Sequence, residues 1–248
     1  MTAAAGTTGT RSWLRVNGPA DPRLTVVCLP HAGAGATSFA RWQAAFDPDV
    51  RLARVRLPGR EDAPHEAPLR RVHQAVDGLL PAVSALVGDS PVALYGHSMG
   101  ALVAYELARA MAAAGTPPVR LAVSGRRAPH LPPRRPPIHL LPDDEFLAGV
   151  DAMSAAPVRR TAAGTPYLLR VLRADLELGE EYAHAADPVL HVPLTAFGGV
   201  DDPVVAPDEI AAWADVAADG ADVRIRPGGH FFHHDSRAVI AAALQSGA

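Results

Sequence analysis

One short segment restricts the fold of this chain more than any other. An apolar run, Val92–Tyr95, leads into Gly96–Gly100 (G-H-S-M-G), and a helical pattern follows at once. This is G-x-S-x-G at a junction between a strand and a helix. The chain turns so sharply there that a side chain at either flanking position would clash, and glycine removes the clash. The pattern predicts that Ser98 projects from a sheet edge as a nucleophile; an ordinary glycine turn is the alternative.

The rest of the chain alternates short apolar runs with helical patterns, as parallel strands joined by crossover helices do. The predicted strands are Leu24–Leu29, Val50–Leu57, Val92–Tyr95, Leu121–Ser124, Leu194–Phe197 and Val223–Arg226. The predicted helices are Leu69–Val87, Met99–Ala114 and a segment near Ile210–Ala217. Most strands are continuously apolar, which indicates helices on both faces of the sheet. The predicted class is α/β: an α/β-hydrolase fold with a mostly parallel sheet.

Residues 126–191 interrupt this alternation. Their Pro- and Arg-rich start, Pro129–Pro137, cannot form a regular helix or a central strand. Two helical patterns follow, at Asp143–Met153 and at roughly Tyr167–Tyr182. The interval is far longer than the roughly dozen residues that a parallel crossover requires. We therefore expect residues 1–125 and 192–248 to form the hydrolase core and residues 126–191 to form an inserted helical lid; a disordered linker is the alternative.

A serine nucleophile needs a base, and the base needs an acid that orients it. In this fold the order along the chain is serine, acid, histidine, with both partners in loops after late strands. Asp201 and Asp202 follow the strand Leu194–Phe197. We prefer Asp202 because it directly precedes Pro203, a common arrangement of the orienting acid, and Asp201 is the alternative.

The predicted base is His230, which follows the strand Val223–Arg226 and two glycines that let its loop approach the serine. His233 and His234 are the alternatives. Together with Asp235 these histidines could also be read as a metal site. No second motif supplies matching ligands, so we expect no metal.

The oxyanion of a reacting ester needs two hydrogen-bond donors. The N–H of Met99 opens a helix, where unpaired N–H groups favour negative charge. The loop Pro30–Ala36 follows the first apolar strand with small residues, and we choose Ala32 as the second donor. A nucleotide-binding glycine loop is the alternative, but its full spacing is absent. We expect His31, His97 and Phe231 to contact the substrate; a role in orienting the serine turn is the alternative for His97.

Composition excludes several other classes. The net charge of −3 argues against a nucleic-acid partner. Residues 1–11 lack the apolar core of a secretory signal, and no apolar stretch approaches the length of a membrane span. We therefore expect a soluble, cytoplasmic monomer without membrane contact. The lone cysteine, Cys28, lies within an apolar run and is predicted to be a buried core residue.

With these pieces in place, the chain resembles type II thioesterases, the stand-alone editing enzymes of polyketide and nonribosomal peptide assembly lines. The resemblance covers nearly the whole chain. Seven segments carry it, in this order: Leu29–Gly33, Leu57–Glu61, Tyr95–Gly100, Ser124–Pro129, Leu141–Phe146, Leu172–Asp175 and Pro227–Phe232. There is one departure: Met153–Pro157 stands where a glycine-rich segment is expected before the second lid helix.

The resemblance implies a mechanism and a partner. Ser98 would attack a thioester, His230 would act as base and then acid, Asp202 would orient His230, and the N–H groups of Ala32 and Met99 would hold the oxyanion. The partner would be an acyl or peptidyl carrier protein, whose phosphopantetheine arm enters beneath the lid. No cofactor is implied. Three other functions stay open: a chain-releasing thioesterase, a carboxylesterase and a non-catalytic carrier-protein binder.

Carrier proteins are usually acidic, which makes four arginines near the start of the lid candidates for docking. A solvated charged face is the alternative. The four are Arg126, Arg127, Arg134 and Arg135.

Overall fold

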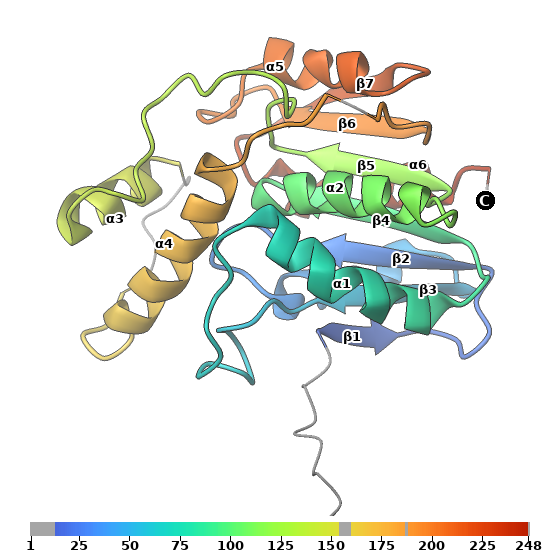
Figure 1. The fold of residues 1–248 in the computed structure, drawn as a ribbon, viewed down its shortest axis with the longest axis horizontal. Helices are drawn as coiled ribbons and strands as arrows, with labels where there is room; N and C mark the ends of the chain where they lie inside the picture. The colour runs from blue at the N-terminus through green and yellow to red at the C-terminus, as the bar shows by residue number, and fades with distance from the viewer. Residues whose placement is uncertain (1–12, 154–159, 187, 248) are drawn as a thin grey trace, which may run out of the picture.

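A single seven-stranded sheet runs through the part of the chain that the computed structural model describes, residues 13–153, 160–186 and 188–247 (Figure 1). The strand order is β1-β3-β2-β4-β5-β6-β7. The strands are β1 (Leu14–Asn17), β2 (Leu24–Leu29), β3 (Val50–Val55), β4 (Val92–His97), β5 (Arg120–Ser124), β6 (Leu194–Gly199) and β7 (Ala221–Arg226). Only β1 is antiparallel to its neighbour; in the central register Val27 lies opposite Leu94, and Leu94 opposite Leu121. The prediction of a mostly parallel sheet is confirmed.

Helices cover both faces of this sheet. They are α1 (Val72–Val87), α2 (Met99–Ala113), α3 (Asp143–Ala152), α4 (Thr165–Glu180), α5 (Pro207–Ala211) and α6 (Arg237–Gln245). Short 3-10 helices span Ala36–Phe39, Gln43–Ala45, Ala212–Val216 and Phe232–His234. In Figure 1, α1 and α2 lie in front of the sheet and α6 lies behind it. Parallel strands buried in this way explain the continuous apolar runs of the sequence.

The strand residues alternate between two hydrophobic cores. Val27 of β2 packs into the core shared with α1 and α2. Its neighbour Cys28 points to the opposite core, with Phe39, Trp42 and Ile240 of α6. Cys28 is fully buried, as predicted, and desolvation raises the pKa of its thiol. Period-two alternation thus builds one core on each side of the sheet.

Four elements of the structure differ from the predicted ones. β1 was not predicted because it is a four-residue edge strand with one buried residue. α6 was also not predicted. The segment near Ile210–Ala217 is a short α5 followed by a 3-10 helix rather than one helix. β7 is an edge strand, so its residues Val223 and Ile225 are exposed and not part of a continuous buried run.

The helices α3 and α4 lie between β5 and β6 in the sequence and stand at the carboxyl edge of the parallel strands (Figure 1). Their own core is small and contains Phe146, Val150 and Leu172 as its buried members. The division into a core and a lid at residues 126 and 191 stays a prediction. The sequence departure at Met153–Pro157 falls largely on residues 154–159, outside the described residues.

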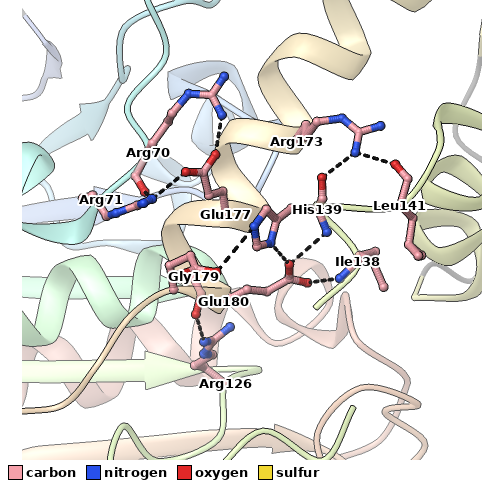
Figure 2. A network of polar contacts seen from close by, with 11 residues as sticks. Arg70, Arg71, Arg126, Ile138, His139, Leu141, Arg173, Glu177, Gly179 and Glu180 are labelled. Atoms are coloured by element: carbon pink, nitrogen blue, oxygen red, sulfur yellow. Dashed lines mark hydrogen bonds and ion pairs between the residues drawn. The ribbon is translucent and has the colours of Figure 1, made fainter. Parts of the chain in front are cut away.

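Polar contacts fix α4 on two sides (Figure 2). Glu177 accepts hydrogen bonds from Arg70 and, at 2.6 Å, from Arg71 at the start of α1. Glu180 accepts hydrogen bonds from the N–H groups of Ile138 and His139, both at 3.1 Å. These contacts attach α4 to the core on one side and to the proline-rich segment on the other. No helix in the described part of the chain has the length and apolar character needed to cross a membrane.

Candidate active site

Ser98 occupies a strained turn between β4 and α2. Its φ of +55° and ψ of −115° lie in a region of backbone conformation where residues other than glycine are rare. A Cβ atom at Gly96 would lie 2.1 Å from the Gly100 carbonyl oxygen, and one at Gly100 would lie 2.3 Å from the Leu29 carbonyl oxygen. Both positions therefore require glycine, for the steric reason that the sequence suggested.

The structure brings Ser98, His230 and Asp202 together. His230 Nε2 lies 3.1 Å from Ser98 Oγ, and His230 Nδ1 lies 2.9 Å from Asp202 Oδ2. The Asp202 side chain is fully buried, and its Oδ1 accepts a hydrogen bond of 2.8 Å from the Val204 N–H. Asp201, the alternative acid, is exposed. The chain order and geometry are those of a serine nucleophile, a histidine base and an orienting acid.

Of the three predicted substrate contacts, two line a cavity beside Ser98. His31 and Phe231 form part of its wall, with their rings edge to face at a centroid distance of 5.0 Å. Burial, followed by the nearby charges of His230, His234 and Arg60, lowers the pKa of His31 to about 3. At neutral pH His31 therefore presents an uncharged imidazole to the cavity.

The prediction for His97 is wrong. Its side chain has no exposed surface and does not line the cavities at Ser98. Its Nδ1 lies 2.7 Å from Ser124 Oγ, and its ring packs on His233 at a centroid distance of 3.8 Å. Burial, with the neighbouring histidines, holds the pKa of His97 well below its usual range. His97 thus lies in the wall behind His230 and does not face the substrate.

Two cavities meet at Ser98, and each also contacts Ala32 and His230. The first has a volume of about 230 Å³. Its wall is mainly apolar and comes from α3, α4 and the loops; it includes Val150, Met153, Leu168, Leu172, Leu176 and Phe231. The second has a volume of about 400 Å³ and runs past Met99 and Arg126 towards the proline-rich segment. The site can therefore hold an apolar group and a longer, more polar group on the two sides of one serine.

Comparison with known proteins identifies the family. Residues 24–245 match the family described as Thioesterase domain. The chain belongs to the thioesterase family. Gramicidin S biosynthesis protein GrsT of Aneurinibacillus migulanus is 36% identical over 218 residues, which cover 87% of this chain and 85% of that protein. Thioesterase PikA5 of Streptomyces venezuelae is 35% identical over 227 residues, 90% of this chain and 80% of that protein.

The structural comparison agrees. The structure of the type II thioesterase BorB from the borrelidin biosynthetic cluster matches with a TM-score of 0.83 and 34% identity, over 96% of each chain. The protein is therefore a thioesterase and a serine hydrolase, and the predicted resemblance to type II thioesterases is confirmed.

Sequence reasoning missed two residues of this thioesterase site. Ser124 ends β5 and holds His97, and it also lies 2.8 Å from the Tyr95 hydroxyl. Gly125 follows with φ of +58°, and a Cβ there would lie 2.5 Å from His97 Cε1 and 3.4 Å from His230 Cε1. Their place in the resembling segment Ser124–Pro129 was the available signal, but only the fold shows that Ser124 contacts His97 and that Gly125 lies against His97 and His230.

The four arginines that were candidates for carrier docking differ in their surroundings. Arg126 lines the second cavity, donates a hydrogen bond of 2.7 Å to the Gly179 carbonyl, and has a pKa lowered to about 9 by burial (Figure 2). Arg127, Arg134 and Arg135 line the same cavity. Arg134 pairs with Asp208 at 2.6 Å, and Arg135 donates to the Pro203 carbonyl. Docking by these residues stays a prediction.

Metal binding has no support in the described part of the thioesterase. Across residues 13–153, 160–186 and 188–247, no group of three or more His, Cys, Asp or Glu side chains is arranged to hold a metal ion. His233, one of the alternative bases, is 1% exposed and packs against His97 and His234. The histidine that contacts Ser98 Oγ is His230.

Proposed function

We propose that this protein is an editing thioesterase that hydrolyses short or aberrant acyl groups from phosphopantetheinyl carrier proteins of polyketide or nonribosomal peptide assembly lines. The observation that carries the proposal is the Ser98–His230–Asp202 geometry at the junction of two cavities. The similarity to GrsT, to PikA5 and to the type II thioesterase BorB supports the assembly-line context.

In the first half of the reaction, Ser98 Oγ attacks the thioester carbonyl carbon and its proton passes to His230 Nε2. Asp202 accepts a hydrogen bond from Nδ1 and stabilises the imidazolium. The N–H groups of Ala32 and Met99 are the donors we assign to the oxyanion, each worth about 10²–10³ in rate. Collapse breaks the carbon–sulfur bond, and His230 returns the proton to the departing thiol.

In the second half, a water molecule takes the place of the thiol. His230 accepts its proton while the water oxygen attacks the acyl-Ser98 carbonyl, and collapse then releases the acid and restores the serine hydroxyl. No step of this cycle requires a metal or an organic cofactor.

The two cavities suggest how the substrate divides. The apolar cavity suits an acyl chain, because its wall carries side chains such as Leu168 and Leu172. The cavity past Arg126 suits the phosphopantetheine arm, which carries amides, a hydroxyl and a phosphate. The volume of about 230 Å³ on the acyl side favours short acyl groups over full-length products.

The test is deacylation of acetyl- and propionyl-loaded carrier protein, followed by intact mass spectrometry. The wild-type protein should remove the acyl group and the Ser98→Ala variant should not. A protein that cleaves simple oxygen esters as well as the carrier-bound thioesters would instead be a carboxylesterase. Preference for full-length chains would indicate a chain-releasing thioesterase, and no hydrolysis of any ester would leave a carrier-protein binder.

A further inference from the structure

A buried ion pair joins two distant segments behind the active site. Arg60 follows β3, and Asp175 lies on α4, 115 residues further along the chain. The guanidinium donates two hydrogen bonds of 2.7 Å, one to each carboxylate oxygen. The two side chains are 2% and 1% exposed. This is the bidentate geometry that makes arginine–carboxylate pairs directional.

Both members of the pair also bind the loop that contains Ala32. The Gly33 N–H donates a hydrogen bond of 2.7 Å to Asp175 Oδ2. Arg60 Nη1 donates a hydrogen bond of 2.8 Å to the Ala34 carbonyl. The loop itself turns tightly, with the Ala34 N–H bonded to the His31 carbonyl at 3.1 Å. The backbone immediately after Ala32 is therefore fixed by side chains from two other parts of the molecule.

Stability alone does not account for this pair. Removing two charges from water is costly, and a buried ion pair is often no more stabilising than apolar side chains of the same size. α4 also has other attachments to the core, through Glu177 with Arg70 and Arg71 (Figure 2). The Arg60–Asp175 pair additionally fixes the position of the peptide groups next to Ala32.

We propose that Arg60 and Asp175 are positioning residues that place the Ala32 N–H for the oxyanion, and that they make this placement depend on the docking of α4. The inference rests on the proposed function, because it assigns Ala32 to the oxyanion. α4 also supplies Leu168, Leu172 and Leu176 to the wall of the apolar cavity. The helix that encloses the acyl group thus also completes the site of its hydrolysis.

Variants of this pair should lower kcat and leave KM nearly unchanged. An oxyanion forms only after attack, so a misplaced Ala32 N–H weakens the transition state and leaves substrate binding largely intact. Asp175→Asn keeps the size of the side chain and removes its charge. We expect a fall in kcat approaching about 10²-fold with the acetyl thioester of N-acetylcysteamine, comparable to the loss of an oxyanion donor. Asp175 also lines the second cavity, but its two carboxylate oxygens are bonded to Arg60 and to the Gly33 N–H, so KM should stay close to the wild-type value.

A second readout reports the tetrahedral state directly. Phenylboronic acid forms a tetrahedral adduct with a serine hydroxyl, so its affinity should fall together with kcat. The matched control is Glu177→Gln on the same helix, which weakens the attachment to Arg70 and Arg71; the hydrogen bonds of Glu177 are with these two arginines and not with the loop. This control should keep the wild-type kcat and boronic acid affinity.

Folding of the variants has its own safeguard. Asp175→Asn leaves Arg60 buried without a counter-charge, so the double variant Arg60→Met, Asp175→Leu removes both charges at similar volume. If Asp175→Asn does not fold, the double variant tests the positioning role in its place, and it should show the same loss of kcat.

A kcat and a boronic acid affinity equal to those of the wild type would overturn the positioning role, and so would a rise in KM alone. If the wild-type protein hydrolyses no thioester, the proposed function fails by itself. The boronic acid affinities of the variants still judge the pair in that case.

Discussion

The sheet edge that carries the triad and the inserted helices α3 and α4 are held in place by different means. Ser98 stands in a turn so tight that neighbouring Gly96 has no room for a methyl group. The Asp202 side chain is fully buried and accepts a backbone hydrogen bond in its own loop. By contrast, α3 and α4 share a small core with three buried members. α4 is joined to the rest of the molecule by Leu178 in the main core and by arginine–carboxylate pairs at Asp175 and Glu177.

This difference matches the demands of the two tasks. Proton transfer between Ser98 and His230 needs atoms held to within a fraction of an ångström, and backbone geometry provides that. Selection among acyl groups depends on the shape of an apolar wall. Substitutions of side chains on α3 and α4 can change that shape without disturbing the triad. The Arg60–Asp175 pair is where the two regions meet.

The largest expected effect on activity comes from a substitution in the triad at the sheet edge. Asp202→Asn removes the charge that orients His230 and stabilises its imidazolium, and we expect kcat to fall by about 10⁴-fold. Asp201→Asn is the matched control, because Asp201 is exposed and its neighbour makes the contact with His230. Steady-state kinetics with an acyl thioester measures both. Equal losses in the two variants would move the orienting role away from Asp202.

An added methyl group should lower the free energy of unfolding at the serine turn but not on α4. Gly96→Ala would place a methyl group 2.1 Å from a backbone oxygen, and overpacking of this kind costs about 1–3 kcal/mol or more. Gly179→Ala lies on α4, where the nearest atom is Arg126 Nη1 at 3.4 Å and alanine favours the helix by up to about 1 kcal/mol. Urea unfolding should show a large loss for the first variant and little change or a gain for the second. The opposite ranking would contradict the contrast between the regions.

The inserted helices should control acyl preference by a smaller amount. Leu168→Phe adds volume to the wall of the apolar cavity. We expect kcat/KM for longer acyl thioesters to fall by at least about 10-fold relative to acetyl, the usual scale for a methylene group in an apolar pocket. Leu140→Phe adds similar volume at a position that is 74% exposed and serves as the control. Unchanged relative rates for Leu168→Phe would place the acyl chain elsewhere.

Acid should weaken the sheet edge gradually. His97 and His233 are buried, and burial lowers the pKa of each well below 6.5. Below pH 6.5 these histidines bind protons in the unfolded chain but stay neutral in the folded protein. As the pH decreases, the free energy of unfolding therefore falls by up to about 1.4 kcal/mol per pH unit for each histidine. Above pH 6.5 both states are neutral there and this contribution is constant.

Urea unfolding at pH 7.5, 6.0 and 5.0 measures this slope. His233→Asn removes one of the buried imidazoles and should make the dependence on pH shallower. A slope that is the same with and without His233 would contradict the assignment.

Most of the sheet was predictable, because continuous apolar runs such as Leu24–Leu29 carry a strong signal. The short strand β1 carries almost none, with only Leu14 buried. α6 has buried Ile240 and Leu244 four residues apart, a helical periodicity that is visible in the sequence. Local pattern therefore predicted the buried strands and failed at the edge and the end of the chain.

The candidate site divides in the same way. Ser98, Asp202 and His230 each follow a predicted strand, so the topology of a parallel sheet brings them to one edge. His97 was misplaced because a residue next to the nucleophile can face the cavity or the core, and only packing against Ser124 and His233 decides. The Arg60–Asp175 contact spans 115 residues, and no local pattern specifies such a partner.

The most direct test of the account is to trap the acyl-enzyme. The protein is mixed briefly with a propionyl thioester, quenched in acid, and examined by intact mass spectrometry and peptide mapping. The account predicts one propionyl group per chain, on Ser98, and none in the Ser98→Ala variant, which should also lose thioester hydrolysis. A propionyl group on another residue, or undiminished hydrolysis by Ser98→Ala, would contradict it.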